Sequence, residues 1–373
     1  MNRRRHADSP SACAAPFSLR RRNMTQCPSG VTMSRLAFAA AVMIGSAPVA
    51  MAQDSVTFAG FGGQYQSSVR KALFDPAGKK LGVRVREESH SGLASVRVQV
   101  QSGKPGWDIV QMGEADCARG QSEGLFEQLD YSKIDTAGIA PQARGTAYIG
   151  SNYVSTVLAW QKDKYKDKPP RNWKDFWDPN AFPGRRAMHI YPQESMEIAL
   201  LADGVDKDKL YPLDADRALA SLAKLKPSID VFWQSGAQAA QLLKDGEVDM
   251  MVIWGSRVAS VLADGAPVDF TYDQALLGFG CFGIPKGAAN AAAAQRMIAE
   301  MVTPEIQANI PDLLPYYGPI NERAFAVKQF SADALAKANS SPQNKGRQAP
   351  LEPAWWADNN ASVQERYQAL IAK

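Results

Sequence analysis

Short apolar runs alternate with amphipathic stretches in the first third of the chain. Residues 56–59, 83–85 and 107–112 have the apolar and β-branched character of strands, and residues 64–73 and 91–101 between them have helical spacing. This alternation predicts a parallel sheet with helices packed on its faces. Ligands bind such sheets beyond the carboxyl ends of the strands, so a binding site is expected there.

A second α/β unit follows with the same alternation. Its expected strands are residues 154–160, 187–190, 231–233, 250–254, 268–272 and 280–284. Its expected helices are residues 173–177, 196–203, 216–224 and 288–302. No internal repeat, low-complexity tract or linker lies between the two units. The pattern therefore predicts an α/β fold of two lobes, with the chain passing between them in regular structure.

Three aromatic side chains, those of Phe61, Trp233 and Trp254, come where an expected strand stops. One such side chain equally well caps a core, but three suit a cleft that sandwiches a ligand, and their π-faces attract organic cations. Phe61 is followed by Gly62 and Gly63, without the G-x-G-x-x-G spacing of a dinucleotide site. These glycines favour close approach of a ligand or a tight strand-to-helix turn.

Three charged side chains also follow strand ends. Glu114 and Glu194 are either solvated or paired with an ammonium group in a cleft. Arg257 forms either a salt bridge on the surface of a lobe or a bidentate clamp for a carboxylate. Inside a cleft, these side chains would present both signs of charge to a ligand.

The basic excess of the chain is confined to its first residues. The formal net charge is +4, but residues 1–52 carry seven arginines and one acid, which leaves 35 basic and 37 acidic side chains and a net charge of −2. Arg35, the apolar run at residues 36–44 and Ala50-Met51-Ala52 match a signal peptide over residues 33–52, cleaved before Gln53. The sequence thus predicts export to the periplasm and no nucleic-acid partner.

Motifs for catalysis and metal binding are absent from the sequence. It contains no G-x-S-x-G, P-loop or H-E-x-x-H motif, and His90 and His189, the histidines after the leader, lack ligands at metal spacing. We expect no metal, no cofactor and no enzymatic activity. The cysteines after the leader, Cys117 and Cys281, form either a disulfide or two buried thiols.

A set of short motifs spreads over the chain. They are WDIV at 107–110, EGL at 123–125, LDYSKI at 129–134, WKDFW at 173–177, FPG at 182–184, LADGV at 201–205, GEV at 246–248, WGSR at 254–257 and YGP at 317–319. Together they resemble extracellular solute-binding proteins of the spermidine/putrescine type, over about residues 55–370. Each motif alone is weak, but the combination is specific.

The resemblance implies a type II-like periplasmic-binding-protein fold, with crossing strands between two lobes and a ligand cleft between them. We assign residues 53–152 and 260–320 to the first lobe and residues 153–259 and 321–373 to the second. The implied partners are a small-molecule ligand and the permease and ATPase of an ABC importer at the inner membrane. The chain itself is expected to act as a monomer.

The resemblance also implies the ligand-binding residues. In the first lobe, the loop after the first strand corresponds to Phe61, Gly62, Gly63 and Tyr65, and the loop after the third strand corresponds to Gly113 and Glu114. In the second lobe, the acidic loop corresponds to Glu194, and the aromatic pair corresponds to Trp233 and Trp254. The stretch after the second tryptophan corresponds to Ser256 and Arg257. Polyamine binders have an acid in that last stretch, where Arg257 would repel a second ammonium. A zwitterion such as an ω-amino acid is therefore favoured, with putrescine and spermidine as alternatives.

Two other functions compete with solute binding. A ferric or anion-binding protein of the same fold is the first, because iron sites use adjacent tyrosines and Tyr316 and Tyr317 are adjacent. Their place before Gly318-Pro319 equally suits core or hinge packing. A secreted enzyme is the second, and it would need a nucleophile–base or acid–base pair in the cleft.

Overall fold

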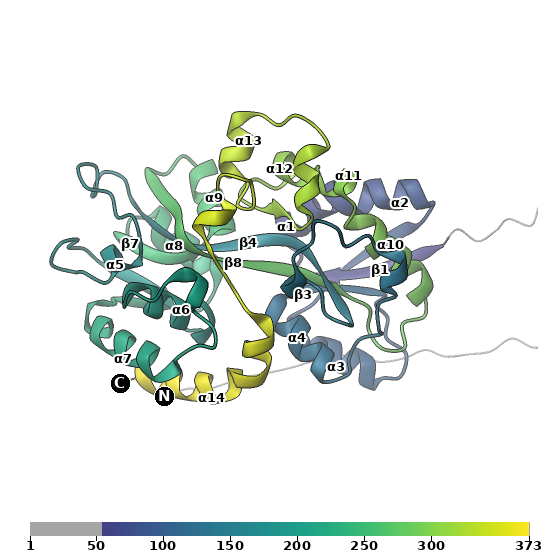
Figure 1. Cartoon of the computed structure of the whole chain (residues 1–373), viewed down its shortest axis with the longest axis horizontal. Coiled ribbons are helices and arrows are strands. Elements are labelled where there is room, and N and C mark those ends of the chain that lie inside the picture. Colours follow the sequence, from purple (N-terminus) through teal and green to yellow (C-terminus); the bar gives the residue numbers. More distant parts are fainter. Residues whose placement is uncertain (1–53, 373) are drawn as a thin grey trace, which may run out of the picture. The chain divides into compact units, whose positions relative to one another are not determined.

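A mixed sheet with helices on both sides runs through the computed structural model, which describes residues 54–372 (Figure 1). Its strand order is β2-β1-β3-β8-β4-β7-β5-β6, with β9 beside β4 and β10 beside β8. The strands are β1 Ser55–Gly60, β2 Arg84–Ser89, β3 Ile109–Gly113, β4 Tyr148–Gln161, β5 Arg186–His189, β6 Val231–Trp233, β7 Met250–Trp254, β8 Val268–Gly283, β9 Gly318–Pro319 and β10 Ala349–Pro350.

The helices fill the connections between these strands, as the alternating pattern predicted. They are α1 Gly63–Val69, α2 Asp75–Leu81, α3 Leu93–Gln101, α4 Glu114–Ser122, α5 Trp173–Phe176, α6 Pro192–Ala202, α7 Ala215–Leu225, α8 Gly236–Lys244, α9 Gly255–Ala263, α10 Ala291–Met301, α11 Pro304–Gln307, α12 Ile310–Leu313, α13 Ala332–Lys337 and α14 Pro353–Ile371. A π-helical segment, Arg70–Phe74, joins α1 to α2. The predicted α/β fold is confirmed.

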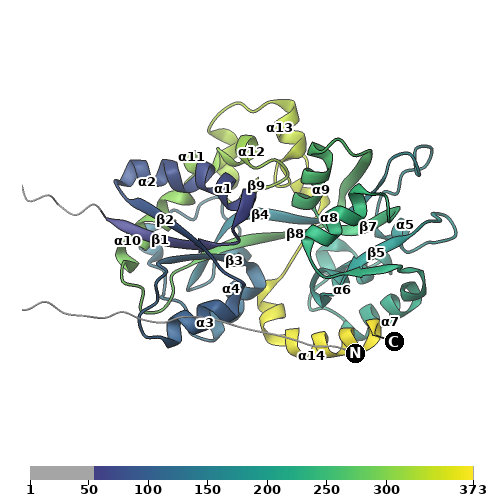
Figure 2. The ribbon, with the colours of Figure 1, turned by 180° about the vertical axis from the view of Figure 1, so that it is seen from behind.

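The first unit forms the parallel arrangement expected from the sequence. β1 pairs in parallel with β2 and with β3, with Val56 opposite Val85 and Phe58 opposite Ile109. Helices α2 and α10 lie on one side of this part of the sheet, and α3 and α4 lie on the other (Figures 1 and 2). The carboxyl ends of β1 and β3 therefore reach the same edge.

The prediction of two separate strands at residues 268–272 and 280–284 was wrong. The structure has one long strand, β8, which pairs antiparallel with β4 along most of its length. Gln274 adopts a left-handed φ of 58° within this strand, and the register with β4 shifts between Thr156 and Leu158. A local irregularity of this kind, like a β-bulge, bends a strand without ending it, so the break in the apolar pattern was misread as two elements.

The buried apolar residues form separate clusters on either side of the middle of β4 and β8. The first cluster contains residues between Val56 and Tyr153 and between Leu277 and Ile320. The other two contain residues between Val157 and Leu276, joined by Ala349, Leu351 and the buried face of α14. The two long strands are thus shared by both parts, and the lobe boundaries assigned from the sequence remain a prediction.

Helix α14 is a second link between the two parts. It contacts α4 at one end and α6 and α7 along the rest, and it runs along one side of the sheet in both views (Figures 1 and 2). Its Trp356 and Tyr367 are fully buried. The sequence pattern of this stretch did not predict a helix.

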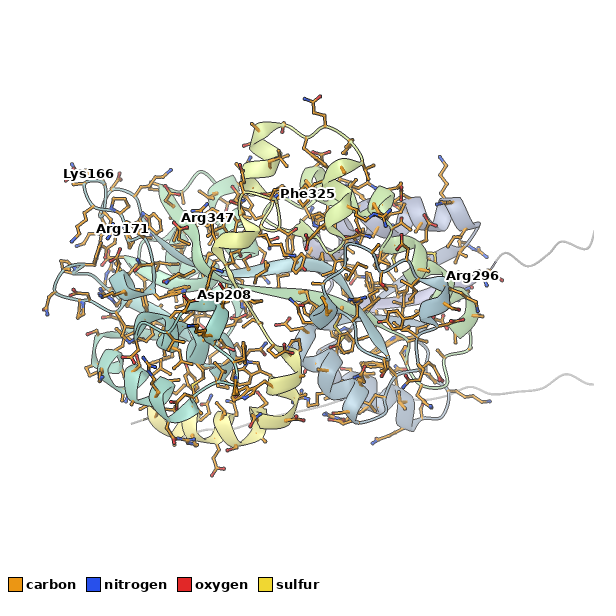
Figure 3. The ribbon with its side chains drawn as sticks, in the orientation of Figure 1. Lys166, Arg171, Asp208, Arg296, Phe325 and Arg347 are labelled. Atoms are coloured by element: carbon orange, nitrogen blue, oxygen red, sulfur yellow. A yellow bond between two sulfur atoms is a disulfide. The ribbon has the colours of Figure 1, made fainter. Side chains whose placement is uncertain are left out.

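A disulfide joins Cys117 in α4 to Cys281 in β8, with their Cα atoms 6.5 Å apart. This observation decides between the two states left open by the sequence. The expected signal peptide lies outside the described residues. Within residues 54–372, no helix combines the length and apolar character needed to cross a membrane. Charged side chains such as Lys166, Arg171 and Arg296 lie at the periphery (Figure 3).

Candidate ligand-binding site

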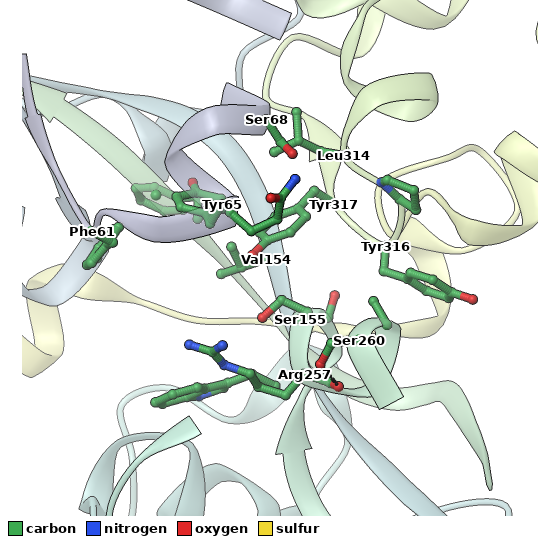
Figure 4. Close-up of a pocket in the computed structure, with 18 of the residues that line it drawn as sticks. Phe61, Tyr65, Ser68, Val154, Ser155, Arg257, Ser260, Leu314, Tyr316 and Tyr317 are labelled. Atoms are coloured by element: carbon green, nitrogen blue, oxygen red, sulfur yellow. Dashed lines mark hydrogen bonds between the residues drawn. The ribbon is translucent and has the colours of Figure 1, made fainter. Parts of the chain in front are cut away.

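A cavity of about 1000 Å³ opens where several strands end (Figure 4). Its walls come from the segments that follow β1, β3 and β7, from the middle of β4 and β8, from the first turns of α6 and α9, and from residues 313–317. Both core regions therefore contribute to the cavity. Its position agrees with the general preference for the carboxyl ends of strands in α/β sheets.

Most of the expected ligand-binding residues lie in the walls of this cavity. Those that line it are Phe61, Tyr65, Gly113, Glu114, Glu194, Trp254, Ser256 and Arg257. Gly62 and Gly63 do not line it; they form the turn into α1 with φ angles of 71° and 63°. Their glycine character is therefore explained by the backbone conformation of this turn.

Trp233 lies in the core and not in the cavity wall. Its side chain is fully buried, and its indole Nε1 donates a hydrogen bond to the carbonyl of Val252 at 3.0 Å. The ring packs edge-on against Trp254 with 5.0 Å between centroids. Trp233, the last residue of β6, thus fills the space behind Trp254. Of the expected aromatic pair, only Trp254 lines the cavity.

Glu114 is a buried carboxylate with no cationic partner among the described side chains. It begins α4, and its oxygens accept hydrogen bonds from Gln193 Nε2 at 2.9 Å and from the backbone N–H of Phe279 at 3.4 Å. Burial, and then the neighbouring charge of Glu194, raise the pKa of Glu114 to about 8. A side chain at Gly278 would collide with this carboxylate, so the glycine leaves room for it.

Glu194 holds the ring of Trp254 in place. Its Oε2 accepts a hydrogen bond from Trp254 Nε1 at 3.2 Å and lies 3.1 Å from His189 Nε2. The residue adopts a left-handed φ of 72° directly after the extended Gln193. Such a backbone conformation costs about 1–3 kcal/mol in a residue other than glycine, and it persists where surrounding contacts require it.

Arg257 lies in the first turn of α9, on the opposite side of the cavity from Phe61 and Tyr65 (Figure 4). No carboxylate of residues 54–372 lies within ion-pair distance of its guanidinium. A side chain added at Gly236 would meet Arg257 Nε at 2.4 Å, so the arginine side chain rests against this glycine. The first N–H groups of α9 also lack a side-chain cap. A helix N-terminus and a free arginine together attract an anion.

Sequence reasoning missed several wall residues. Gln193 and Tyr191 directly follow β5, and Tyr191 stacks on Trp254 with 6.5 Å between centroids. Ser155 lies in the middle of β4, where no strand end marked it. The segment Tyr191-Pro192-Gln193 was identifiable, because it follows a strand end just as Glu194 does.

Tyr316 and Tyr317 both line the cavity but do not converge. Tyr317 packs on Tyr65 with 5.1 Å between ring centroids. Tyr316 instead contacts Phe270, and its side chain points away from Tyr317 (Figure 4). Ser256 and Arg257 lie beside the Tyr317 hydroxyl, and both lower its pKa. Burial has the larger effect, so the pKa of Tyr317 is raised overall. No cluster of three or more histidine, cysteine or acidic side chains that could hold a metal ion occurs in residues 54–372.

Comparison with known proteins adds the family. The model of a family described as bacterial extracellular solute-binding proteins matches residues 72–338. The chain belongs to this family. A gamma-aminobutyric acid-binding protein of Pseudomonas aeruginosa is 31% identical over 353 residues, which covers 92% of this chain and 97% of that protein.

Two solved structures agree with the family assignment. An ABC transporter substrate-binding protein from Bradyrhizobium japonicum USDA 110 is 41% identical, with a TM-score of 0.82 over 85% of this chain and 99% of that one. The binding protein MotA from A. tumefaciens B6, in complex with glucopine, is 36% identical, with a TM-score of 0.76 over the same shares. The chain is thus a solute-binding protein and not an enzyme.

Proposed function

We propose that this chain is the periplasmic component of an ABC importer and captures a small solute with one ammonium and one carboxylate group. An ω-amino acid such as gamma-aminobutyric acid (GABA) is the favoured ligand. The observation that carries the proposal is the presence, in the walls of one cavity, of a buried acid, Glu114, and an arginine, Arg257, that has no acidic partner among the described side chains. The P. aeruginosa relative is named for binding GABA, which supports this ligand class.

The ammonium end is assigned to Glu114. Among the described residues its carboxyl group has amide donors but no cation near it, so a ligand ammonium would offset the cost of burying its charge. The stacked rings of Tyr191 and Trp254 supply an aromatic wall in the same cavity, and aromatic faces attract ammonium groups. Glu194 orients Trp254 within this wall.

The carboxylate end is assigned to Arg257 and the start of α9. The guanidinium fork matches a carboxylate in a bidentate arrangement, and the uncapped N–H groups of the helix add donors at the same place. The hydroxyls of Ser256 and Tyr317 lie next to these groups. An anionic ligand group would therefore find donors from both parts of the chain.

Polyamines suit these walls less well. A diamine that placed one ammonium at Glu114 would bring its second ammonium toward Arg257, where like charges repel. At 4 Å and an effective dielectric constant of about 20, this repulsion amounts to ~4 kcal/mol. Putrescine and spermidine are therefore the second-ranked ligands, and the diverging side chains of Tyr316 and Tyr317 give no support to an iron site.

The proposal also covers the export of the chain and its assembly with a transporter. The signal peptide over residues 33–52 would deliver the chain to the periplasm as a monomer that begins at Gln53 and docks on a permease with its ATPase. N-terminal sequencing of the exported protein tests this part directly. A chain retained unprocessed in the cytoplasm would contradict it.

The variant Arg257→Ala tests the assignment of the carboxylate end. We expect it to weaken GABA binding at least tenfold, because a charge-assisted bidentate contact is lost, while binding of the monoamine butylamine does not weaken. The matched control is Arg296→Ala, which removes an arginine at the periphery of the molecule (Figure 3). Unchanged GABA affinity in Arg257→Ala would place the carboxylate elsewhere and restore the polyamine alternative.

A further inference from the structure

One hydrogen bond in the cavity joins the two parts of the molecule. Gln193 Nε2, at the start of α6, donates to Glu114 Oε1, at the start of α4, at 2.9 Å. Helix α6 packs in the second core cluster, whereas Cys117 and Ala118 of α4 belong to the first. The amide of one part therefore contacts the buried acid of the other.

The position of Gln193 is set by unusual backbone geometry. Gln193 has extended angles (φ −54°, ψ 140°), and Glu194 after it is left-handed (φ 72°). These angles send two consecutive side chains to different partners, Gln193 to Glu114 and Glu194 to Trp254. A regular first turn of α6 would not do so, which gives the strain at this turn a role in the site.

The amide of Gln193 has the polarity of an ammonium group without its charge. It points an N–H donor at the carboxylate from a hydrogen-bonding distance that an ammonium nitrogen would also take. A carboxylate oxygen can accept from both in principle, but the Oε1 that Gln193 occupies lies in a tight space beside Gly278 and Leu351. The amide and a ligand ammonium thus compete for one place.

We propose that Gln193 is a built-in competitor of the ligand, whose amide occupies the Glu114 carboxylate until a ligand ammonium displaces it. The inference rests on the proposed function, since it assumes that Glu114 receives the ammonium end. It makes Gln193 a residue that lowers affinity for every ligand with an ammonium group at this place. Ligands that reach only Arg257 leave Gln193 where it is.

The variant Gln193→Ala tests the inference through two ligands. We expect GABA to bind about tenfold more tightly, because the hydrogen bond from Gln193 to the Glu114 carboxyl group no longer has to be broken. Butyrate, which has the carboxylate but no ammonium, should bind with unchanged affinity. Gln193→Asn, whose shorter side chain does not reach Glu114, should behave as Gln193→Ala does.

The matched control is Gln241→Ala, because Gln241 also donates to a carboxylate, that of Asp245, but on α8 and outside the cavity. It should bind both ligands as the unmodified protein does. GABA affinity that is unchanged or weaker in Gln193→Ala, with this control normal, would overturn the inference and leave the proposed function intact.

A second readout needs no ligand and separates the two proposals. Removing a donor to the ionised form of Glu114 must raise the pKa of that carboxyl, which carbon-13 NMR of labelled glutamate side chains measures. An upward shift in Gln193→Ala, absent in Gln241→Ala, supports the contact even if the unmodified protein binds no GABA. An unchanged midpoint would overturn the inference whatever the ligand.

Discussion

At the scale of single residues, Glu114 is the group whose protonation state we expect to depend most on a ligand. Its carboxyl is buried against α6 and β8 and has amide donors but no cation among the described side chains. The pKa of Glu114 is raised to about 8 by burial first and by the charges of Glu194 and Glu197 in addition. We therefore expect the group to be largely protonated near pH 7 in the free protein.

Binding of an ammonium group should release a proton from Glu114. An adjacent cation favours the ionised form and lowers the pKa, so the affinity for GABA should rise as the pH increases from 6 to 8. The ligand amine stays charged over this range, since amines of its type titrate near pH 10. Calorimetry at pH 7 in buffers of different ionisation enthalpy measures the release as a buffer-dependent heat.

The variant Glu114→Gln is the control for this proton release. It keeps the size of the side chain and removes the titrating group, so the buffer dependence should vanish and GABA binding should weaken. Glu197, whose pKa burial raises to about 7, remains in that variant. A buffer dependence that persists in Glu114→Gln would assign the proton to Glu197 and contradict our account of Glu114.

At this scale, the sequence predicted which charged and aromatic residues line the cavity better than it predicted their side-chain contacts. Glu114, Glu194, Trp254 and Arg257 were identified because chemically distinctive side chains followed apolar runs. Trp233 satisfied the same rule but turned into the core, because a strand-end position does not specify which way the side chain points. The contact between Gln193 and Glu114 could not be predicted, since it spans 79 residues of chain and depends on a backbone kink.

At the scale of elements, the site depends on how α4 is attached to β8. The disulfide between Cys117 and Cys281 lies one turn after Glu114, and the N–H of Phe279 in β8 donates to the Glu114 carboxylate. Two tethers thus hold the start of α4 against the long strand. The disulfide links two residues that are 164 positions apart in the sequence.

Replacing both cysteines with alanine should lower stability and affinity together. We expect a loss of ~2–5 kcal/mol in the free energy of unfolding, because the disulfide closes a long loop. GABA affinity should fall several-fold at a temperature where the variant is folded, since the start of α4 can shift away from β8. Circular dichroism and calorimetry measure the two effects. Reduced stability with full affinity would show that the hydrogen bond to Phe279 positions Glu114 without the disulfide.

The sequence pattern predicted short elements more reliably than long ones. β1, β3 and β7 were predicted to within a few residues, because each is a buried apolar run that ends at glycine or a polar residue. β8 was divided in two, since Gln274 and the glycines interrupt its apolar run without breaking its pairing with β4. Helix α14 escaped notice because its polar residues continue around much of its surface, with Trp356, Val363 and Tyr367 as its main buried contacts.

At the scale of the whole molecule, we expect β4 and β8 to be the elements about which its two core regions move. They belong to both core regions, and the cavity lies where residues of both meet. Ligands commonly close such an arrangement by bending at a few strand or loop residues. Closure would bring Phe61, now exposed, toward the ligand.

GABA should therefore compact the protein and change its tryptophan fluorescence. Closure excludes water from the cavity, and the indole of Trp254 lies in its wall. We expect a smaller radius of gyration by small-angle X-ray scattering and a saturable change in emission that is largely lost in Trp254→Phe. Superimposable scattering profiles with and without saturating ligand would indicate a rigid receptor.

The central claim is that one cavity recognises an ammonium group and a carboxylate at the same time. Calorimetry with four ligands of one carbon skeleton tests it most directly: GABA has both groups, butylamine only the amine, butyrate only the carboxylate, and putrescine two amines. We predict that GABA binds at least 100-fold more tightly than each of the other three, because only GABA satisfies both Glu114 and Arg257. Putrescine binding as tightly as GABA, or butylamine as tightly as either, would contradict the account.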